Sequence, residues 1–263
     1  MNRNFSLHFR IYTRLAFDNR QKAESLCRKF VDYGGHFVPM SFSAYEPIRT
    51  KFDPEDLSKP SALLSETSHE LLLKRSKPRW TAYVYWFRGR TRPWFWTFDF
   101  GAEWTKGNKP KEIVDFLIDL CADFPPVFAS GGLSADWFDK HDVKDSKTGA
   151  FQKSAGANFN PGTGLPGIYW FNFFGEELIA HFGRTSLMRL DGLVIVSEKS
   201  NGIGFLPYET PDHQDAAWRR ACERQIVEIL GEQYFFNLAK AAGKRPRWRT
   251  PIPGATDAKS LRE

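Results

Sequence analysis

The stretch GLPGIYWFNFFGEEL, residues 164–178, places five aromatic side chains in six consecutive positions between glycines. Side chains alternate between the two faces of a strand. One face carries Ile168, Trp170, Asn172 and Phe174, and the other carries Tyr169, Phe171 and Phe173. Apolar side chains on both faces are typical of a strand in the middle of a sheet that is covered on both sides. We therefore predict a central strand here.

Asn172 is the polar exception within this predicted strand. A buried side-chain amide needs hydrogen-bond partners, and we interpret this one as holding a neighbouring loop in place rather than as a catalytic amide. Glu176 and Glu177 follow Gly175 at a predicted helix start. The helix dipole favours acidic side chains at that position, so we do not interpret them as a catalytic carboxylate pair.

The composition predicts a folded, water-soluble protein. Of the 263 residues, 41% are hydrophobic, 16% are aromatic and 26% are charged, which excludes disordered and fibrous proteins. The N-terminus lacks the apolar core and cleavage site of a signal peptide. No apolar run approaches the roughly 20 residues that a membrane-spanning helix requires. We therefore expect a cytoplasmic protein.

Hydrophobic periodicity predicts strands and helices on both sides of the quoted stretch. In the first half we predict a strand at about 5–12, a helix that begins with Asp18 as its N-cap and ends at Gly34, a hairpin of 79–87 and 94–100, and a helix within 109–124. In the second half we predict a short helix from Glu176, strands at 193–197 and 203–208, and a helix over 212–230. The predicted inward side chains of that last helix include Ala216, Cys222, Ile226, Ile229 and Leu230.

This order of elements predicts an α+β fold: two small antiparallel sheets, or one continuous mixed sheet, backed by amphipathic helices. The segment 142–166 is rich in Gly, Ser, Asn, Lys and Pro, which predicts a connecting loop. The predicted units are an N-terminal half at 1–141, the connector at 142–166, a C-terminal half at 167–239 and a basic tail at 240–263, with the two halves packed together as one unit.

The quoted stretch also carries a resemblance to a known family. The pattern consists of Gly164, Leu165, Pro166, Gly167, Trp170, Asn172, Phe174 and Gly175. It resembles bacterial immunity proteins of the fifty-second polymorphic-toxin immunity family, with the best agreement over about 160–207. Members typically lie beside toxins with a restriction-endonuclease-like domain, including an effector of the type VI secretion system. The resemblance implies a cytoplasmic protein without enzymatic activity that binds and neutralises a cognate nuclease effector.

An acidic segment, ADWFDKHDVKDSK at 135–147, is the first candidate for contact with such a partner. Its acids recur every third residue with two aromatic residues between them, and helical or tight-turn geometry would gather them on one side. Aromatic anchors beside charges suit an interface with a basic nuclease cleft, while a solvated loop is the alternative. The candidate contact residues are Asp136, Trp137, Phe138, Asp139, Asp142 and Asp145, with the aromatic surface near Trp170 as a second candidate.

A nucleic-acid-binding module is the alternative function. The chain has a formal net charge of +6, and residues 240–263 contain seven basic and two acidic residues, a net of +5. Arg88, Arg90 and Arg92 lie between the two aromatic strands of the predicted hairpin, where stacked bases would find both rings and cations. The rest of the chain carries no basic stripe, so we favour an exposed arginine turn and a solvated tail.

No pattern in the sequence indicates a catalytic centre, a cofactor or a metal site. Asp139, His141 and Asp142 could contribute to a cation site, but no further ligand stands at a recognisable spacing. The glycine-rich segments lack the context of a phosphate-binding loop, and no nucleophile elbow is present. The three cysteines are widely spaced and are interpreted as buried thiols.

Overall fold

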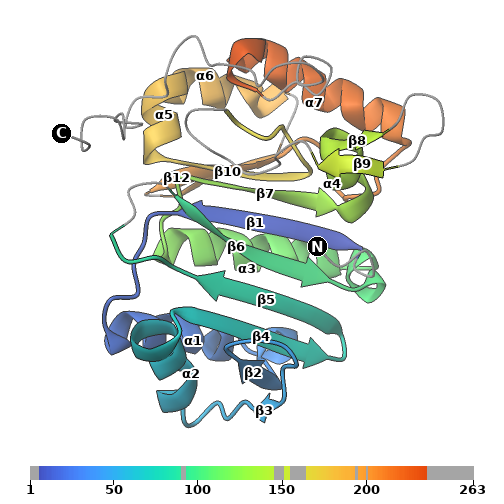
Figure 1. Ribbon diagram of the computed structural model, residues 1–263. Helices are drawn as coiled ribbons and strands as arrows, with labels where there is room; N and C mark the ends of the chain where they lie inside the picture. Colours follow the sequence, from blue (N-terminus) through green and yellow to red (C-terminus); the bar gives the residue numbers. More distant parts are fainter. Residues whose placement is uncertain are drawn as a thin grey trace.

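The computed structural model describes residues 6–89, 93–144, 151–154, 164–192, 195–199 and 201–235. Most of its strands form one antiparallel sheet in the order β11-β12-β10-β7-β1-β6-β5-β4-β2-β3 (Figure 1). Their bounds are β1 Leu7–Thr13, β2 Ser41–Ser43, β3 Thr50–Lys51, β4 Glu70–Ser76, β5 Arg79–Tyr85, β6 Trp94–Phe100, β7 Phe128–Leu133, β10 Phe171–Gly175, β11 Ile195–Lys199 and β12 Gly202–Leu206. A separate ribbon pairs β8, Asp142–Lys144, with β9, Phe151–Ser154.

The α+β class is confirmed, but the two halves share a single sheet. The junction is the pairing of β10 with β7, in which Phe171 lies opposite Gly131 and Phe174 opposite Phe128. β7 also pairs with β1, so the strands of the C-terminal half extend the sheet of the N-terminal half. Of the two expected arrangements, the continuous sheet is the one found, and its described strand pairs are all antiparallel rather than mixed. Within the predicted connector, β8 and β9 form a ribbon rather than a loop.

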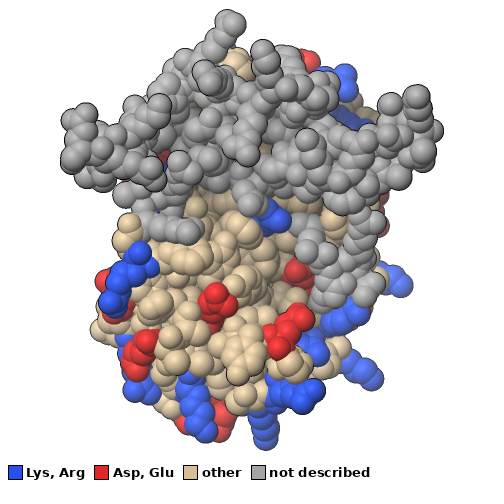
Figure 2. All heavy atoms as spheres, in the orientation of Figure 1, with Lys and Arg blue, Asp and Glu red and all other residues tan. Residues whose placement is uncertain are grey.

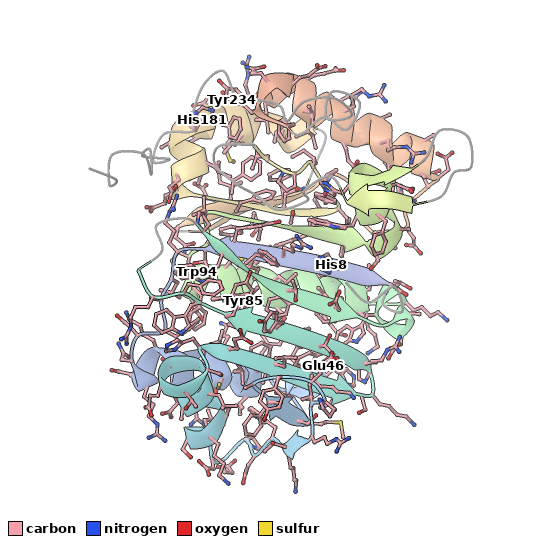
Figure 3. All side chains as sticks on the ribbon, in the orientation of Figure 1. His8, Glu46, Tyr85, Trp94, His181 and Tyr234 are labelled. Carbon is pink, nitrogen blue, oxygen red and sulfur yellow. The ribbon has the colours of Figure 1, made fainter. Side chains whose placement is uncertain are left out.

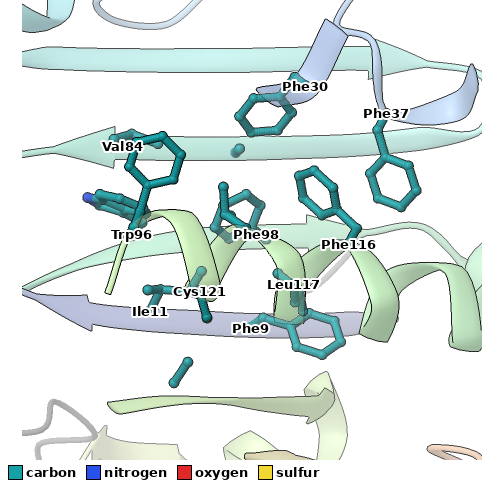
Figure 4. Close-up of a cluster of buried hydrophobic side chains, with 14 of the residues drawn as sticks. Phe9, Ile11, Phe30, Phe37, Val84, Trp96, Phe98, Phe116, Leu117 and Cys121 are labelled. Carbon is teal, nitrogen blue, oxygen red and sulfur yellow. The ribbon is translucent and has the colours of Figure 1, made fainter. Parts of the chain in front are cut away.

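One face of the sheet is covered by helices from the N-terminal half. These are α1, Arg20–Tyr33, α2, Ser58–Ala62, which continues as a π-helical turn at Leu63–Thr67, and α3, Lys109–Asp123. Phe30 of α1 stacks on Trp80 of β5 with ring centroids 5.8 Å apart and contacts Phe116 of α3 at 5.3 Å. Aromatic side chains from strands and helices thus interlock in this core (Figure 4). Each buries a large apolar area, which accounts for the high aromatic content of the chain.

On the other face, the helices of the described residues cover only one end. There lie α4, Ser134–His141, α5, Glu176–Phe182, α6, Arg184–Met188, and α7, Ala216–Leu230 (Figure 1). Phe174 of β10 and Phe205 of β12 pack in a second apolar cluster with Leu178 of α5, Leu187 of α6 and Ile226 of α7. Short 3-10 turns complete the described chain at Gly35–Phe37, Ala102–Thr105, Arg189–Gly192 and Glu232–Tyr234. The sheet is therefore enclosed on both sides at its β12-β10-β7 end.

The quoted stretch does contain a central strand, but the strand is shorter than predicted. β10 begins only at Phe171, between β12 and β7. Because Trp170 precedes the strand, it does not alternate with Asn172 and instead joins Phe171 and Phe173 in the first core. Phe174 faces the second core, as the alternation predicts.

The last long helix differs most from its prediction. α7 begins at Ala216, and its N-cap is Asp215, whose carboxylate accepts a hydrogen bond from the Trp218 N–H at 2.8 Å. Ile226 and Leu230 are buried as predicted, but Ile229 is 48% exposed. Arg219 and Glu223 are buried in its place. An apolar pattern could not indicate this inner face, because half of it is charged.

The first helix begins one residue later than predicted. Its N-cap is Asn19, whose side-chain oxygen accepts a hydrogen bond from the Lys22 N–H at 3.0 Å. Asp18 instead forms an ion pair with Lys22, with 2.8 Å between Nζ and Oδ1, on the exposed surface.

We predict that Asn19→Ala lowers the free energy of unfolding by about 1 kcal/mol, because an N–H at the helix start loses its acceptor. Asp18→Ala is the matched control, and it should cost less because it removes only an exposed ion pair with Lys22 and an exposed hydrogen bond from the Asn19 amide. Urea unfolding followed by circular dichroism measures both. A larger loss for Asp18→Ala than for Asn19→Ala would contradict the assignment of the cap.

Candidate interaction surface

The second face of the sheet is open over β6, β5 and β4 among the described residues. In β6, side chains alternate strictly between buried and half-buried, and β5 and β4 follow the same pattern over most of their length. The buried set faces α1 and α3, so the half-buried set faces away from them. Figure 2 views this face and shows a hollow of uncharged side chains with some acidic ones, while lysine and arginine side chains lie mostly around the rim.

The strand register places the side chains of the open face in two rows that cross the sheet. The first row runs from Lys74 through Thr81 and Asp99 to His8. The second runs from Leu72 through Tyr83 and Thr97 to Arg10. Each row has a threonine near its middle and larger side chains at its ends. The short side chains of Thr81 and Thr97 leave room in the floor, beside the longer Tyr83.

This hollow is a groove of about 810 Å³, which we call the open-face groove. Its floor is the two rows, and its wall on the β4 side is the loop between β2 and β3, with Glu46, Pro47, Ile48 and Arg49. Figure 3 shows His8 and Glu46 on opposite sides of it. The lining contains four cationic side chains, Arg10, Arg49, Lys74 and Arg79, and two carboxylates, Glu46 and Asp99.

A chain of hydrogen bonds fixes the β1 side of the groove. Arg10 Nε donates to His8 Nε2 at 3.0 Å, so His8 carries its proton on Nδ1 and donates it to Asp99 Oδ1 at 2.7 Å. The Arg10 guanidinium lies between the rings of Phe95 and Trp137, 4.7 and 4.5 Å from their centroids. Burial lowers the pKa of His8, although the hydrogen bond to Asp99 opposes it. A neutral histidine with both nitrogens engaged is suited to orienting Arg10 rather than to transferring protons.

Comparisons with known proteins identify a shared fold. No protein-family model matches the sequence, and no curated protein matches it either. Among solved structures, the Pseudomonas aeruginosa T6SS protein PA0821 is similar to this chain, with a TM-score of 0.59 and 15% identity. The match covers 94% of this chain and 74% of that one. At this identity the likeness shows the fold alone.

The helices of the described residues also bear on the membrane question. None of them combines the length and the apolar character that crossing a membrane requires.

The described acidic side chains of the predicted acidic segment, Asp136 and Asp139, do not share one exposed face. Asp136 and Asp139 lie on α4, but Asp136 is half-buried and faces Arg219 of α7 across 3.5 Å. The helix ends at His141, so Asp142 belongs to β8. Asp145 lies outside the described residues. The periodicity of three therefore holds for less than two helical turns, and only Asp139 is exposed among the acids of α4.

The aromatic residues proposed as contacts, in this segment and near Trp170, have different environments. Trp137 is 2% exposed and stacks on Tyr169 with ring centroids 5.0 Å apart. Trp170 is 1% exposed. Neither ring is accessible to a partner in this structure, and Trp137 acts instead on the groove by holding Arg10. Phe138 is half-exposed and remains a candidate for contact.

α4 and α7 are joined by a buried ionic cluster that the sequence patterns did not indicate. Lys140 Nζ lies 2.7 Å from Glu223 Oε2, donates to the Ile168 carbonyl at 2.7 Å, and lies 4.1 Å from the centroid of the Tyr169 ring. The Tyr208 hydroxyl donates to the other oxygen of Glu223 at 3.1 Å. Burial raises the pKa of Glu223, and Lys140 opposes that rise. The cluster fastens α7 to the body of the protein.

The motif that carries the family resemblance consists of residues with structural contacts. Gly164 and Gly167 have φ angles of 99° and 144°, which favour glycine. The Asn172 amide accepts from the Tyr169 N–H at 3.1 Å and donates to the Tyr169 carbonyl at 2.7 Å. Trp170 Nε1 donates to the Tyr208 carbonyl at 3.1 Å. Leu165 and Pro166 are buried. These contacts shape the entry to β10, so the motif marks the fold rather than a contact surface.

The residues proposed for nucleic-acid binding are mostly outside the described ranges. Arg88 is described and exposed at the end of the β5 segment. Arg90, Arg92 and the tail at 240–263 are not among the described residues. That alternative stays a prediction.

Sequence reasoning missed the open-face groove itself. The signal was present in β1, β5 and β6, where polar residues alternate with the apolar ones that were assigned to the core. That alternation indicates that one face of a strand is not part of the main core. It does not indicate which polar residues meet, because the rows depend on the order and register of four strands.

Proposed function

We propose that this chain is an immunity protein that binds and neutralises a cognate nuclease-type toxin effector in the cytoplasm. The observation that supports this most is the open-face groove, a hollow and chemically mixed surface on a fold that is otherwise layered with helices. The shared fold with a T6SS protein supports it, as does the resemblance of the 164–175 motif to an immunity family. The partner in this proposal is an effector with a restriction-endonuclease-like domain.

The side chains around the groove are those that protein interfaces favour. Tyr83, Tyr85 and Phe87 follow one another along the open face of β5 and beyond its end, with successive ring centroids 5.0 and 5.3 Å apart. Phe95 of β6 lies 5.5 Å from Tyr85. Tyrosine and arginine are enriched among residues that dominate binding energy. A row of partly exposed rings beside cations is therefore suited to bind another protein.

Rigidity of this surface also suits stoichiometric binding. Arg10 is held by His8 and two rings, and His8 is held by Asp99. A surface that is ordered before binding loses less entropy on association. Because the nitrogens of His8 are engaged in orienting Arg10, we propose that the protein acts by binding rather than by catalysis. Phe138 and Asp139 of α4, next to the Trp137 that contacts Arg10, are proposed as further contacts.

The proposal predicts rescue of cells that express the toxin. Co-expression of this chain with the nuclease encoded beside its gene should restore growth, and the two purified proteins should elute together from a sizing column. A catalytically inactive toxin serves as the control, since it should form the complex without any growth defect to rescue. If growth is not restored and no complex forms, the proposed function is wrong.

A further inference from the structure

The lining of the open-face groove contains more cationic than anionic side chains. Asp99 is already hydrogen-bonded to His8, and Arg10 to the same ring. In the part of the chain that the structure describes, the side chains of Arg49 and Lys74 have no ion-pair partner. The groove thus offers two available cations, one from β4 and one from its wall.

Both cations stand beside apolar groups of the groove; Lys74 is half-buried, and Arg49 is exposed. On the groove floor, Lys74 lies one row away from Leu72 and Tyr83, and on the loop Pro47 and Ile48 directly precede Arg49. Leu72 and Lys74 are both half-buried. A charge interaction in a partly desolvated site is stronger than at an open surface. The lining therefore favours a ligand that combines carboxylates with an apolar side chain.

The loop that forms the wall also presents an aromatic side chain to solvent. Tyr45 precedes Glu46 and is 75% exposed, more than any other large hydrophobic side chain of the described residues. Its neighbours in the loop line the groove. An exposed tyrosine at the rim of a groove is a typical anchor for a protein partner.

We infer that the open-face groove binds an acidic segment of the toxin, whose carboxylates pair with Arg49 and Lys74 and whose apolar side chain packs on Leu72 while Tyr45 contacts the flanking surface. The inference rests on the proposed function. The groove also contains Glu46 at its exposed rim, but its cations outnumber its carboxylates by four to two. That excess favours an acidic segment over a basic one.

The first test compares two charge reversals in the full chain. Arg49→Glu with Lys74→Glu should weaken binding to the inactive toxin by on the order of 100-fold in calorimetry. Arg220→Glu with Arg224→Glu on the exposed face of α7 changes the net charge equally and should leave affinity within about threefold. If the charge reversal disturbs folding, the milder double variant Arg49→Gln with Lys74→Gln replaces it, and it should also weaken binding. Added salt should weaken wild-type binding more than binding of the groove variants.

The second test locates the contact directly. A photoreactive phenylalanine analogue at Tyr45 should cross-link to the toxin at a peptide that contains aspartate or glutamate. The same analogue at Trp218, which is 40% exposed on α7, is the control and should not cross-link. Cross-links between two copies of this chain, or binding of duplex DNA that the groove variants lose, would overturn the inference.

The outcomes separate this inference from the proposed function. If the wild-type protein binds no toxin, the proposed function is wrong and the inference with it. If the wild type binds and both groove variants bind equally well, the groove is not the contact, and only the inference is wrong.

Discussion

Replacing Lys140 by methionine is expected to lower the free energy of unfolding by about 3–5 kcal/mol, because it leaves the buried Glu223 carboxylate without its cation. The pair lies between α4 and α7, with 2.7 Å between Nζ and Oε2 and with Glu223 only 7% exposed. Methionine keeps the length and most of the volume of the lysine stem, so the loss reports the charge rather than a cavity. Chemical denaturation of the purified protein measures the change.

The matched control is an ion pair of the same type on the surface. Lys111 lies 2.5 Å from Asp115 one turn along α3, and both side chains are substantially exposed. Lys111→Met should change stability little, because solvent already screens that pair. The double variant Lys140→Met with Glu223→Gln should recover part of the loss, since it removes the buried charge as well. Equal losses for Lys140→Met and Lys111→Met would contradict the role assigned to the buried cluster.

The pH dependence of the same variant follows from the pKa of Glu223. Burial raises this pKa above its ordinary value of 4.5, and Lys140 is the main influence that lowers it. The folded state therefore binds the Glu223 proton more tightly than the unfolded state does. The stabilisation that this proton provides is lost as the pH rises through the folded pKa of Glu223. Removing Lys140 raises the folded pKa further. The deficit of Lys140→Met relative to wild type should therefore be larger at about pH 8 than at about pH 5.

The buried ionic cluster also shows a limit of prediction from apolar periodicity. The helix over 212–230 was predicted from apolar periodicity, and Ile226 and Leu230 do face the core. Arg219 and Glu223 share that inner face, because Asp136, Lys140 and Tyr208 supply their partners. The partners come from distant parts of the chain. A charged residue on an inner face can be recognised only when the element opposite it is known.

β7 shows the same limit for strands. The hairpin strands β5 and β6 were predicted because they are rich in aromatic and β-branched residues. β7 reads FASGGL, and its glycines lower its strand propensity. Gly131 is nevertheless required by packing, because a Cβ there would lie 2.2 Å from Cδ1 of Phe9 on the neighbouring strand. The glycines that allow β7 to pack between its neighbours are the same residues that hid it from prediction as a strand.

The sequence indicated which kinds of residue would form a contact surface, but not where on the fold that surface lies. The acidic segment drew attention to Trp137 as an exposed anchor, whereas the ring is buried and holds Arg10. Its environment depends on Tyr169 and His8, which lie in other elements. The polar faces of β1, β5 and β6 could be identified from alternation alone. Their assembly into the open-face groove depends on strand order, which no local pattern in this chain specifies.

Gly175→Ala is the second substitution for which we expect a large effect, a loss of about 3 kcal/mol or more in the free energy of unfolding. Gly175 ends β10, and a Cβ built there would lie 1.9 Å from the carbonyl oxygen of Pro126. That oxygen belongs to the backbone, so a rotamer change cannot relieve the clash. Val127, the residue after Pro126, is held in place by two backbone hydrogen bonds. Its N–H donates to the Tyr12 carbonyl at 2.8 Å, and its carbonyl accepts from the Gly175 N–H at 3.0 Å.

Gly204→Ala on the neighbouring strand is the control, because a Cβ there would lie 3.4 Å from side-chain atoms of Ile118 and Phe173. Those side chains can shift slightly, so we expect a change below about 1 kcal/mol. Urea unfolding measures both variants, and equal stabilities would contradict the close approach at Gly175. The site lies at the enclosed end of the sheet, separated by β7 and β1 from the β6-β5-β4 face. The folded fraction of Gly175→Ala should therefore bind the toxin with wild-type affinity, since none of the residues proposed to contact the toxin touches Gly175.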